Sequence, residues 1–227
     1  MTTGILFDVD GTLVDSNYLH AVCWHDALRS TDHLVAMNVL HRAIGMGSSE
    51  LLSHVLGDDR DKDEDGDIIH AHKVLYQRHW SRLTALPDAE ALLRACAGMG
   101  HRVVLASSAA ADELAALRRV LDADDLIDGA TSSSDVDNAK PEPDLVQVAL
   151  DKGGFAADSA LFVGDSVWDA AACKKADVTF IGLTCGGTSA QELTEAGAIE
   201  VWRDPAELLE NLKTSAIGKL RLDAPGH

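Results

Sequence analysis

The sequence predicts an α/β protein in which a parallel sheet is covered by helices and a helical segment is inserted after the first strand. Three observations support this prediction. Short apolar runs that end at glycine, serine or aspartate recur along the chain, stretches with apolar residues at helical spacing separate them, and one long stretch contains no strand pattern. Strands that alternate with helices of about 10–15 residues form right-handed βαβ units and hence a parallel sheet.

The first strand and the helical segment open the chain. The run Gly4-Ile5-Leu6-Phe7 is short, rich in β-forming residues and bounded by glycines, which predicts a buried strand. Apolar residues then recur at helical spacing in four stretches, with an acidic loop at 57–67 before the last of them: 19–28, 34–44, 50–56 and 68–83. We therefore expect a helical cap domain over residues 15–87.

From residue 88 onward, strand and helix patterns alternate, and together with residues 1–14 they define the expected core domain (1–14 and 88–227). Strands are expected at 102–106, 127–131, 160–163, 178–182 and 198–202. Helices are expected at 88–99, 112–121 and 143–152, in a stretch that runs to 175, and at 190–196 and 205–212. The tail after residue 213 is expected to be frayed.

Composition and charge narrow the class of protein. The chain has 227 residues and a net charge of −18, from 37 acidic and 19 basic residues, which argues against nucleic acid or an anionic membrane surface as a partner. The four cysteines form no CxxC pair, and neither a signal peptide nor an apolar run of about 20 residues is evident. We expect a soluble cytoplasmic protein, monomeric or homodimeric.

Polar residues follow the predicted strands at the points where the strands end. Asp8 and Asp10 follow the first strand, Ser107 follows the strand at 102–106, and Asp165 follows the strand at 160–163. In a parallel sheet the ligand site lies outside the carboxyl ends of the strands, so these side chains should converge on one crevice. Two carboxylates at i and i+2 would repel one another in a dry interior, which indicates that a cation or a phosphate lies beside them.

Two further segments add charge to this crevice. Lys140 precedes Pro-Glu-Pro-Asp, and Pro143 suits the first turn of a helix, so the lysine is placed at a loop-to-helix entry. Asp169 lies four residues after Asp165, and the two share a helix face if a helix has started there. Asp8, Asp165 and Asp169, with a backbone carbonyl, supply the hard oxygens that Mg²⁺ prefers. Alternatively, Asp169 does not bind the metal itself but orients the metal's water ligands or Lys140.

The same residues form a set of groups suited to phosphoryl transfer. Asp8 could attack phosphorus and form an aspartyl-phosphate. Asp10 is placed to protonate the leaving oxygen and later to deprotonate the attacking water. Ser107 and Lys140 would hold the non-reacting phosphate oxygens, with Lys140 also neutralising charge.

These motifs resemble those of the haloacid dehalogenase-like hydrolase superfamily, and they occur in the right order over essentially the whole chain. The motifs are Asp8-Val9-Asp10-Gly11-Thr12, the strand-terminal Ser107, Lys140 before Pro-x-Pro-Asp, and Gly164-Asp165-Ser166-x-x-Asp169. The resemblance implies a Rossmann-like core, a helical cap inserted after the first motif, a Mg²⁺ cofactor held in part by the backbone carbonyl of Asp10, and Asp8 as nucleophile.

Individual residues indicate which branch of the superfamily this chain resembles. Its dehalogenases lack the second aspartate, present here as Asp10, and its phosphonatases use a cap lysine for which Lys62 and Lys73 offer no clear context. The segment with His20 and Trp24 resembles the β-phosphoglucomutase and sugar-phosphatase branch. The mutases, however, carry an acidic residue where this chain has Gly164, and a basic residue in the cap turn 47–50.

We therefore expect a Mg²⁺-dependent phosphatase that acts on a small phosphorylated metabolite such as a sugar phosphate or phosphoglycolate. A hexose-phosphate mutase similar to β-phosphoglucomutase is the alternative, and a regulatory module that kept the fold without turnover is a third. His20 is interpreted either as a hinge or substrate contact of the cap or as an ordinary helix histidine.

Overall fold

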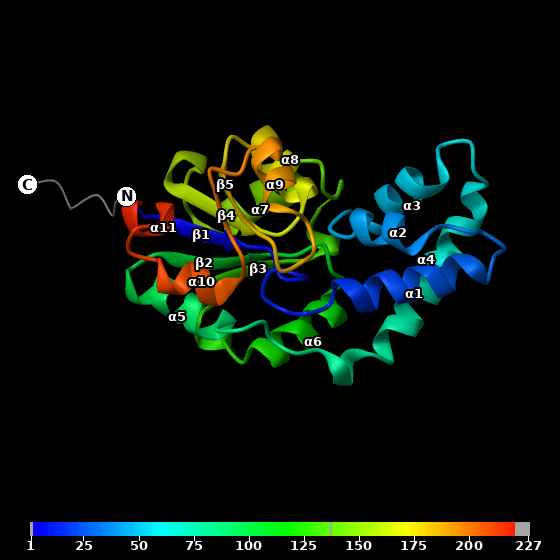
Figure 1. Ribbon diagram of the computed structural model, residues 1–227, viewed down its shortest axis with the longest axis horizontal. Helices are drawn as coiled ribbons and strands as arrows, with labels where there is room; N and C mark the ends of the chain where they lie inside the picture. The colour runs from blue at the N-terminus through cyan, green and yellow to red at the C-terminus, as the bar shows by residue number, and fades with distance from the viewer. Residues whose placement is uncertain (1, 137, 221–227) are drawn as a thin grey trace, which may run out of the picture.

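The structure is a computed structural model that describes residues 2–136 and 138–220. These residues include a six-stranded sheet in which all neighbouring strands are parallel (Figure 1). The strand order is β3-β2-β1-β4-β5-β6. The strands are β1 (Gly4–Phe7), β2 (Arg102–Ala106), β3 (Gly129–Thr131), β4 (Ala160–Gly164), β5 (Thr179–Leu183) and β6 (Glu200–Trp202). The predicted α/β class with a Rossmann-like parallel sheet is confirmed.

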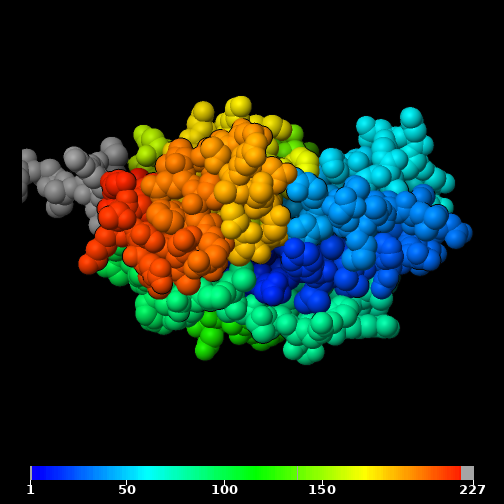
Figure 2. Space-filling view, viewed as in Figure 1, coloured from blue at the N-terminus to red at the C-terminus, as the bar shows by residue number. Residues whose placement is uncertain are grey.

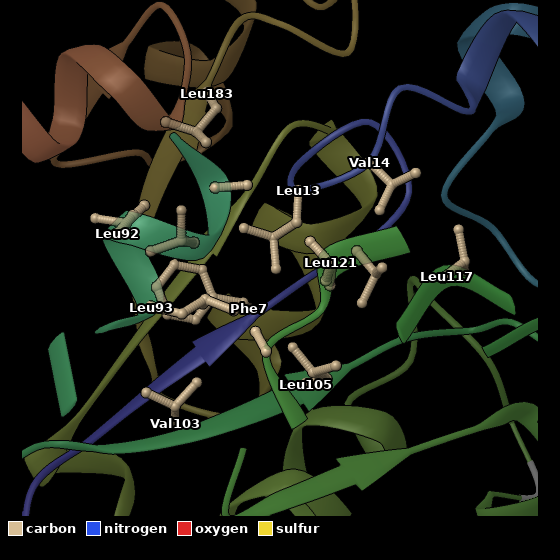
Figure 3. Close-up of a cluster of buried hydrophobic side chains, with 14 of the residues drawn as sticks. Phe7, Leu13, Val14, Leu92, Leu93, Val103, Leu105, Leu117, Leu121 and Leu183 are labelled. Carbon is tan, nitrogen blue, oxygen red and sulfur yellow. The ribbon is translucent and has the colours of Figure 1, made fainter. Parts of the chain in front are cut away.

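Helices cover both faces of the sheet, as the near-continuous apolar strands require. Along β1, Ile5 and Phe7 point into one apolar cluster and Leu6 into the other, and all three are fully buried. Figure 3 shows the first cluster around Phe7. That cluster is covered by α5 (Ala89–Gly98), α6 (Ala111–Leu121), α10 (Pro205–Glu210) and α11 (Ala216–Lys219), and the second by α7 (Asp144–Gly153), α8 (Val167–Lys175) and α9 (Ala190–Ala196).

The inserted helices lie apart from the sheet, on the right in Figure 1. They are α1 (Asn17–Arg29), α2 (Met37–Ala43), α3 (Ser48–Leu56) and α4 (Asp65–Gln77), and they bury a cluster of their own that includes Trp24, Leu40 and Leu51. The two chain segments that join them to the core pair with each other: the Asp15 amide donates to the Thr84 carbonyl at 2.9 Å. The domain boundaries at 15 and 87 remain a prediction. Among the described residues, none of the helices combines the length and apolar character needed to cross a bilayer.

Two expectations for local structure were wrong. The acidic segment 57–67 is not a loop throughout, because α4 already begins at Asp65. Acidic side chains in the first turn of a helix are stabilised by its dipole. The tail is not frayed from residue 213, since α11 follows Ser215, whose hydroxyl accepts from the Gly218 amide, and Ile217 is fully buried in the first cluster.

Replacing Ile217 by Ala is expected to lower the free energy of unfolding by about 2–5 kcal/mol, because the substitution removes buried methylene groups and leaves a cavity. Chemical denaturation followed by circular dichroism measures the change. Lys219→Ala, in the same helix but exposed, is the matched control and should stay within about 0.5 kcal/mol of wild type. Equal stabilities of the two variants would show that α11 does not contribute to the core.

Candidate active site

The carboxyl ends of the central strands bring the predicted residues together. Asp8 directly follows β1 and Asp165 directly follows β4, and these strands are neighbours with Phe7 paired to Val163. The Asp8 amide continues the pairing by donating to the Val163 carbonyl at 2.9 Å. The chain proceeds outward from β1 through β2 to β3 on one side and through β4 to β6 on the other, so this edge is the topological switch point where ligands bind.

Lys140 is the cation of this site, and its side chain is fully buried. Its Nζ lies 2.5 Å from Asp8 Oδ1 and 2.7 Å from Asp169 Oδ1, and it donates to the Ala106 carbonyl at 3.2 Å. Burial alone would lower the pKa of Lys140, but the carboxylates of Asp169 and Asp8 outweigh burial and raise it. The lysine is therefore charged, and it links the first motif to the last.

Asp165 and Asp169 reach the site in different ways. Asp165 lies before α8, which begins at Val167. The expectation that Asp165 and Asp169 share a helix face, which held only if a helix had started at Asp165, is therefore wrong. Asp165 accepts hydrogen bonds from Thr12 Oγ1 at 2.9 Å and from Asn17 Nδ2 at 2.8 Å. Asp169 forms a capping box with Ser166 at the start of α8: its Oδ2 accepts from the Ser166 amide at 3.1 Å and its own amide donates to the Ser166 hydroxyl oxygen at 3.1 Å, which leaves Oδ1 for Lys140.

The three carboxylates of Asp8, Asp165 and Asp169 suit a hard divalent cation. Their nearest oxygens lie within 4.8 Å of one another, and all three residues are buried. Burial raises the pKa of Asp8 to about 7, and burial with the neighbouring carboxylates of Asp8 and Asp169 raises the pKa of Asp165 well above its usual value. Crowded, desolvated carboxylate oxygens are the donors that Mg²⁺ prefers, so the residues present fit this ion.

Asp10 belongs to a second set of contacts, which joins the core to the inserted helices. Its Oδ1 accepts from the Ser16 hydroxyl at 2.6 Å and lies 3.3 Å from His20 Nε2, which is also 3.2 Å from Glu113 Oε1. Burial alone would raise the pKa of Asp10, but the hydrogen bonds from His20 and Ser16 lower it. Burial alone would lower the pKa of His20, but its hydrogen bonds to Asp10 and Glu113 raise it to about 10.

His20 is anchored from the opposite side by aromatic residues of α1 and α4. Its ring stacks on Tyr76 with a centroid distance of 3.8 Å, and its Nδ1 lies 3.2 Å from His72 Nε2. His72 in turn stacks on Trp24 at 4.1 Å. Burial, with the nearby His20, holds the pKa of His72 well below its usual value, so His72 is the neutral acceptor of the pair.

The sequence reasoning did not identify Glu113 and His72 as site residues. His72 lies four residues before Tyr76, on the same face of α4, and that spacing was the available signal. Glu113 lies in the first turn of α6. Nothing in the sequence around Glu113 indicates that α6 meets His20, since only docking of the inserted helices brings them together.

A cavity of about 420 Å³ lies between the inserted helices and the strand ends. Asp8, Asp10 and His20 line it, whereas Lys140 and the other two carboxylates of the cluster are buried beside Asp8 outside the lining. Ser107 is not among the lining residues, and its hydroxyl accepts from the Ala109 amide at 3.0 Å. Its neighbour Ser108 lines the cavity, and within the described part of the chain its buried Oγ has no hydrogen-bond partner.

The inserted helices are closed over this cavity. Trp168 Nε1, at the start of α8, donates to the Arg42 carbonyl of α2 at 2.9 Å, and Arg42 forms an ion pair with Glu192 of α9. Figure 2 shows the resulting contact between the inserted helices in blue and the α9 region in orange. These contacts hold the inserted helices over the strand ends, where Asp8 is buried and Asp10 is partly buried, and reduced contact with water strengthens electrostatic interactions there.

Comparison with known proteins assigns the family. The model of the haloacid dehalogenase-like hydrolase family matches residues 2–177. A protein named phosphoglycolate phosphatase from Rhodospirillum rubrum is 30% identical over 99% of this chain and 96% of its own length. The crystal structure of a hydrolase from Pseudomonas syringae is 32% identical and has a TM-score of 0.90 over 95% of this chain and all of its own. A putative β-phosphoglucomutase from Bacteroides vulgatus shares the fold, with a TM-score of 0.86 at 21% identity over 96% of this chain and 90% of its own. The chain therefore belongs to the haloacid dehalogenase-like hydrolases.

Proposed function

We propose that the protein is a Mg²⁺-dependent phosphatase that hydrolyses a small phosphorylated metabolite through an aspartyl-phosphate on Asp8. One observation carries the proposal: Asp8 and Asp10 both face the cavity, while Lys140, which offsets negative charge, and Asp165, which would help to hold a metal ion, lie beside Asp8 in the wall behind. This arrangement leaves the nucleophile and the acid–base open to substrate. The family and the curated relatives support the same reaction class.

The chain's own residues account for two half-reactions. An Asp8 carboxylate oxygen forms a bond to phosphorus as the ester P–O bond breaks, and the departing alcohol oxygen takes a proton that Asp10 relays from the protonated His20 beside it. Water then attacks the acyl phosphate, Asp10 takes a proton from it and returns it to His20, and inorganic phosphate leaves as the Asp8 carboxylate is restored. Ser108, which lines the cavity, can hold a non-reacting oxygen, while Lys140 offsets negative charge from behind Asp8.

The metal site is assigned to the carboxylates of Asp8, Asp165 and Asp169 and to the backbone carbonyl of Asp10. When bound there, Mg²⁺ supplies positive charge that lets the anionic Asp8 approach an anionic phosphate. Asp169 also has a role that does not depend on the metal, because its ion pair with Lys140 fixes the lysine against Asp8. Removing Asp169 would therefore disturb both the cation site and the phosphate site.

The mutase alternative is disfavoured at Gly164. A side chain at this position would begin within 3.0 Å of the Asp169 carboxylate, because an ideal Cβ lies 2.7 Å from Asp169 Oδ2. The acidic residue that the mutases carry before the metal aspartate would displace Asp169 from Ser166 and Lys140. Mutase activity would appear as isomerised hexose phosphate without net phosphate release when a sugar bisphosphate is added, and we expect none.

Removal of the metal is the direct test of this proposal. Protein treated with EDTA and exchanged into metal-free buffer should release phosphate from p-nitrophenyl phosphate at least about tenfold more slowly, because the charge of Asp8 and the phosphate is then uncompensated. Adding Mg²⁺ should restore the rate, whereas Ca²⁺, which prefers more ligands at longer distances, should not. Rates that do not depend on the metal would contradict the assignment.

A further inference from the structure

Within the described residues, every cationic side chain of the cavity lining already faces a carboxylate of the protein. Besides Asp8 and Asp10 the lining contains two more carboxylates, Glu50 from α3 and Glu113 from α6. Lys73 is the lysine of the described lining, which includes no arginine, and its Nζ forms an ion pair with Asp112 at 3.0 Å. The part of the substrate that leaves as an alcohol therefore meets four carboxylates, while the two cations of the described lining, His20 and Lys73, already face carboxylates of the protein.

We infer that the leaving group is uncharged and carries several hydroxyls, as in polyol or sugar phosphates, and that esters bearing a carboxylate, such as phosphoglycolate, are poor substrates. The inference rests on the proposed phosphatase function and adds the class of substrate. It departs from the substrate in the names of the curated relatives.

Charge is the first step of the argument. In a two-carbon acid ester the carboxylate is separated from the bridging oxygen by one carbon, so it stays close to the ionised Asp10, which relays a proton to that oxygen from His20. Among the described residues, the cationic group in contact with Asp10 is His20 Nε2, which already faces both Asp10 and Glu113. A substrate carboxylate there would meet two like charges and lose its own hydration, which disfavours its binding.

Hydrogen bonding and size are the second step. Carboxylates of Glu50 and Glu113 accept hydrogen bonds from substrate hydroxyls, and Ser48 and Ser108 in the same lining can both donate and accept. The Ser108 Oγ is buried without a partner in the described chain, so a substrate hydroxyl or phosphate oxygen can complete its hydrogen bonding. At about 30 Å³ per water, the cavity of about 420 Å³ has room for a leaving group far larger than glycolate.

The test compares substrates on the intact protein with Mg²⁺. The panel contains phosphoglycolate, glycerol phosphate, ribose 5-phosphate and glucose 6-phosphate, with p-nitrophenyl phosphate as a general phosphatase substrate. The best neutral ester should exceed phosphoglycolate at least about tenfold in kcat/KM, in the range that differential contacts in a pocket provide. Equal or faster turnover of phosphoglycolate overturns the inference but leaves the phosphatase function intact. No hydrolysis of any ester, including the aryl phosphate, overturns both.

Variants assign the selectivity to the lining. Glu50→Gln keeps the shape of the side chain and removes one charge, so the ratio of kcat/KM for phosphoglycolate to that for glycerol phosphate should rise about three- to tenfold. The exposed Glu195→Gln on α9 removes the same charge outside the lining, and the ratio should not change. A selective loss of phosphoglycolate turnover in Lys73→Gln would identify Lys73 as a receptor for a carboxylate and would overturn the inference.

Discussion

An Asp8→Asn protein is expected to lose phosphatase activity by a factor of about 10³ or more, because a carboxamide cannot form the acyl phosphate and removing a nucleophile leaves only residual catalysis. The substitution keeps the side-chain shape and an oxygen that accepts from Lys140 Nζ, now 2.5 Å from Asp8 Oδ1. It also removes one of three crowded carboxylates. The fold should therefore survive, and initial rates on p-nitrophenyl phosphate with saturating Mg²⁺ measure the loss.

The matched control for Asp8 is Asp15→Asn, which makes the same chemical change at an exposed position outside the cavity lining. This control should retain wild-type turnover. Trapping distinguishes the covalent route from direct attack of water: rapid acid quench of wild type should retain radiolabelled phosphate on the protein, and Asp8→Asn should retain none. An active Asp8→Asn protein whose mass confirms that the amide is intact would rule out the aspartyl-phosphate.

The positions of the strand-end residues could be predicted from the sequence because parallel topology constrains them. Apolar runs fix where β1 and β4 end, and neighbouring parallel strands present their carboxyl ends at one edge, so Asp8 and Asp165 had to meet. Lys140 was placed by its proline-flanked turn. The same logic cannot decide which of two adjacent serines after β2 faces the cavity, since consecutive residues point to opposite sides and the turn decides between them. Ser108 lines the cavity, while Ser107 accepts from the turn amide.

The contacts between the inserted helices and the core could not be predicted in this way. His20 is separated by 52 residues from His72 and by still more from Glu113, and neither partner follows a strand. Their meeting depends on how α1 and α4 dock over α6, which is set by packing of whole helices and leaves no local pattern. The hydrogen bond that Asp165 accepts from Asn17, the first residue of α1, likewise depends on how the inserted helices are placed. The sequence therefore predicted which side chains converge at the strand ends better than it predicted which residues the inserted helices bring to the cavity.

Lys140→Met is expected to have large effects on both stability and activity. The fully buried Nζ is paired with Asp8 and Asp169, so its loss leaves buried carboxylates without a partner, and the free energy of unfolding in metal-free buffer should fall by about 3–5 kcal/mol. Turnover with Mg²⁺ should fall by about 10²–10³, the effect of removing one preorganised charge from the transition state. Denaturant titration and initial rates measure the two effects.

The stability of Lys140→Met at increasing Mg²⁺ concentration tests whether Lys140 acts through its charge or through packing alone. Without the lysine, the carboxylates of Asp8, Asp165 and Asp169 should bind Mg²⁺ more tightly, and binding to the native state stabilises it. The stability gap between variant and wild type should therefore narrow as Mg²⁺ is added. Lys175→Met removes an exposed lysine paired with Glu142 at 2.6 Å and should cost no more than about 1 kcal/mol, with no dependence on Mg²⁺. A gap for Lys140→Met that Mg²⁺ leaves unchanged would mean that the lysine supports the site through packing and not through its charge.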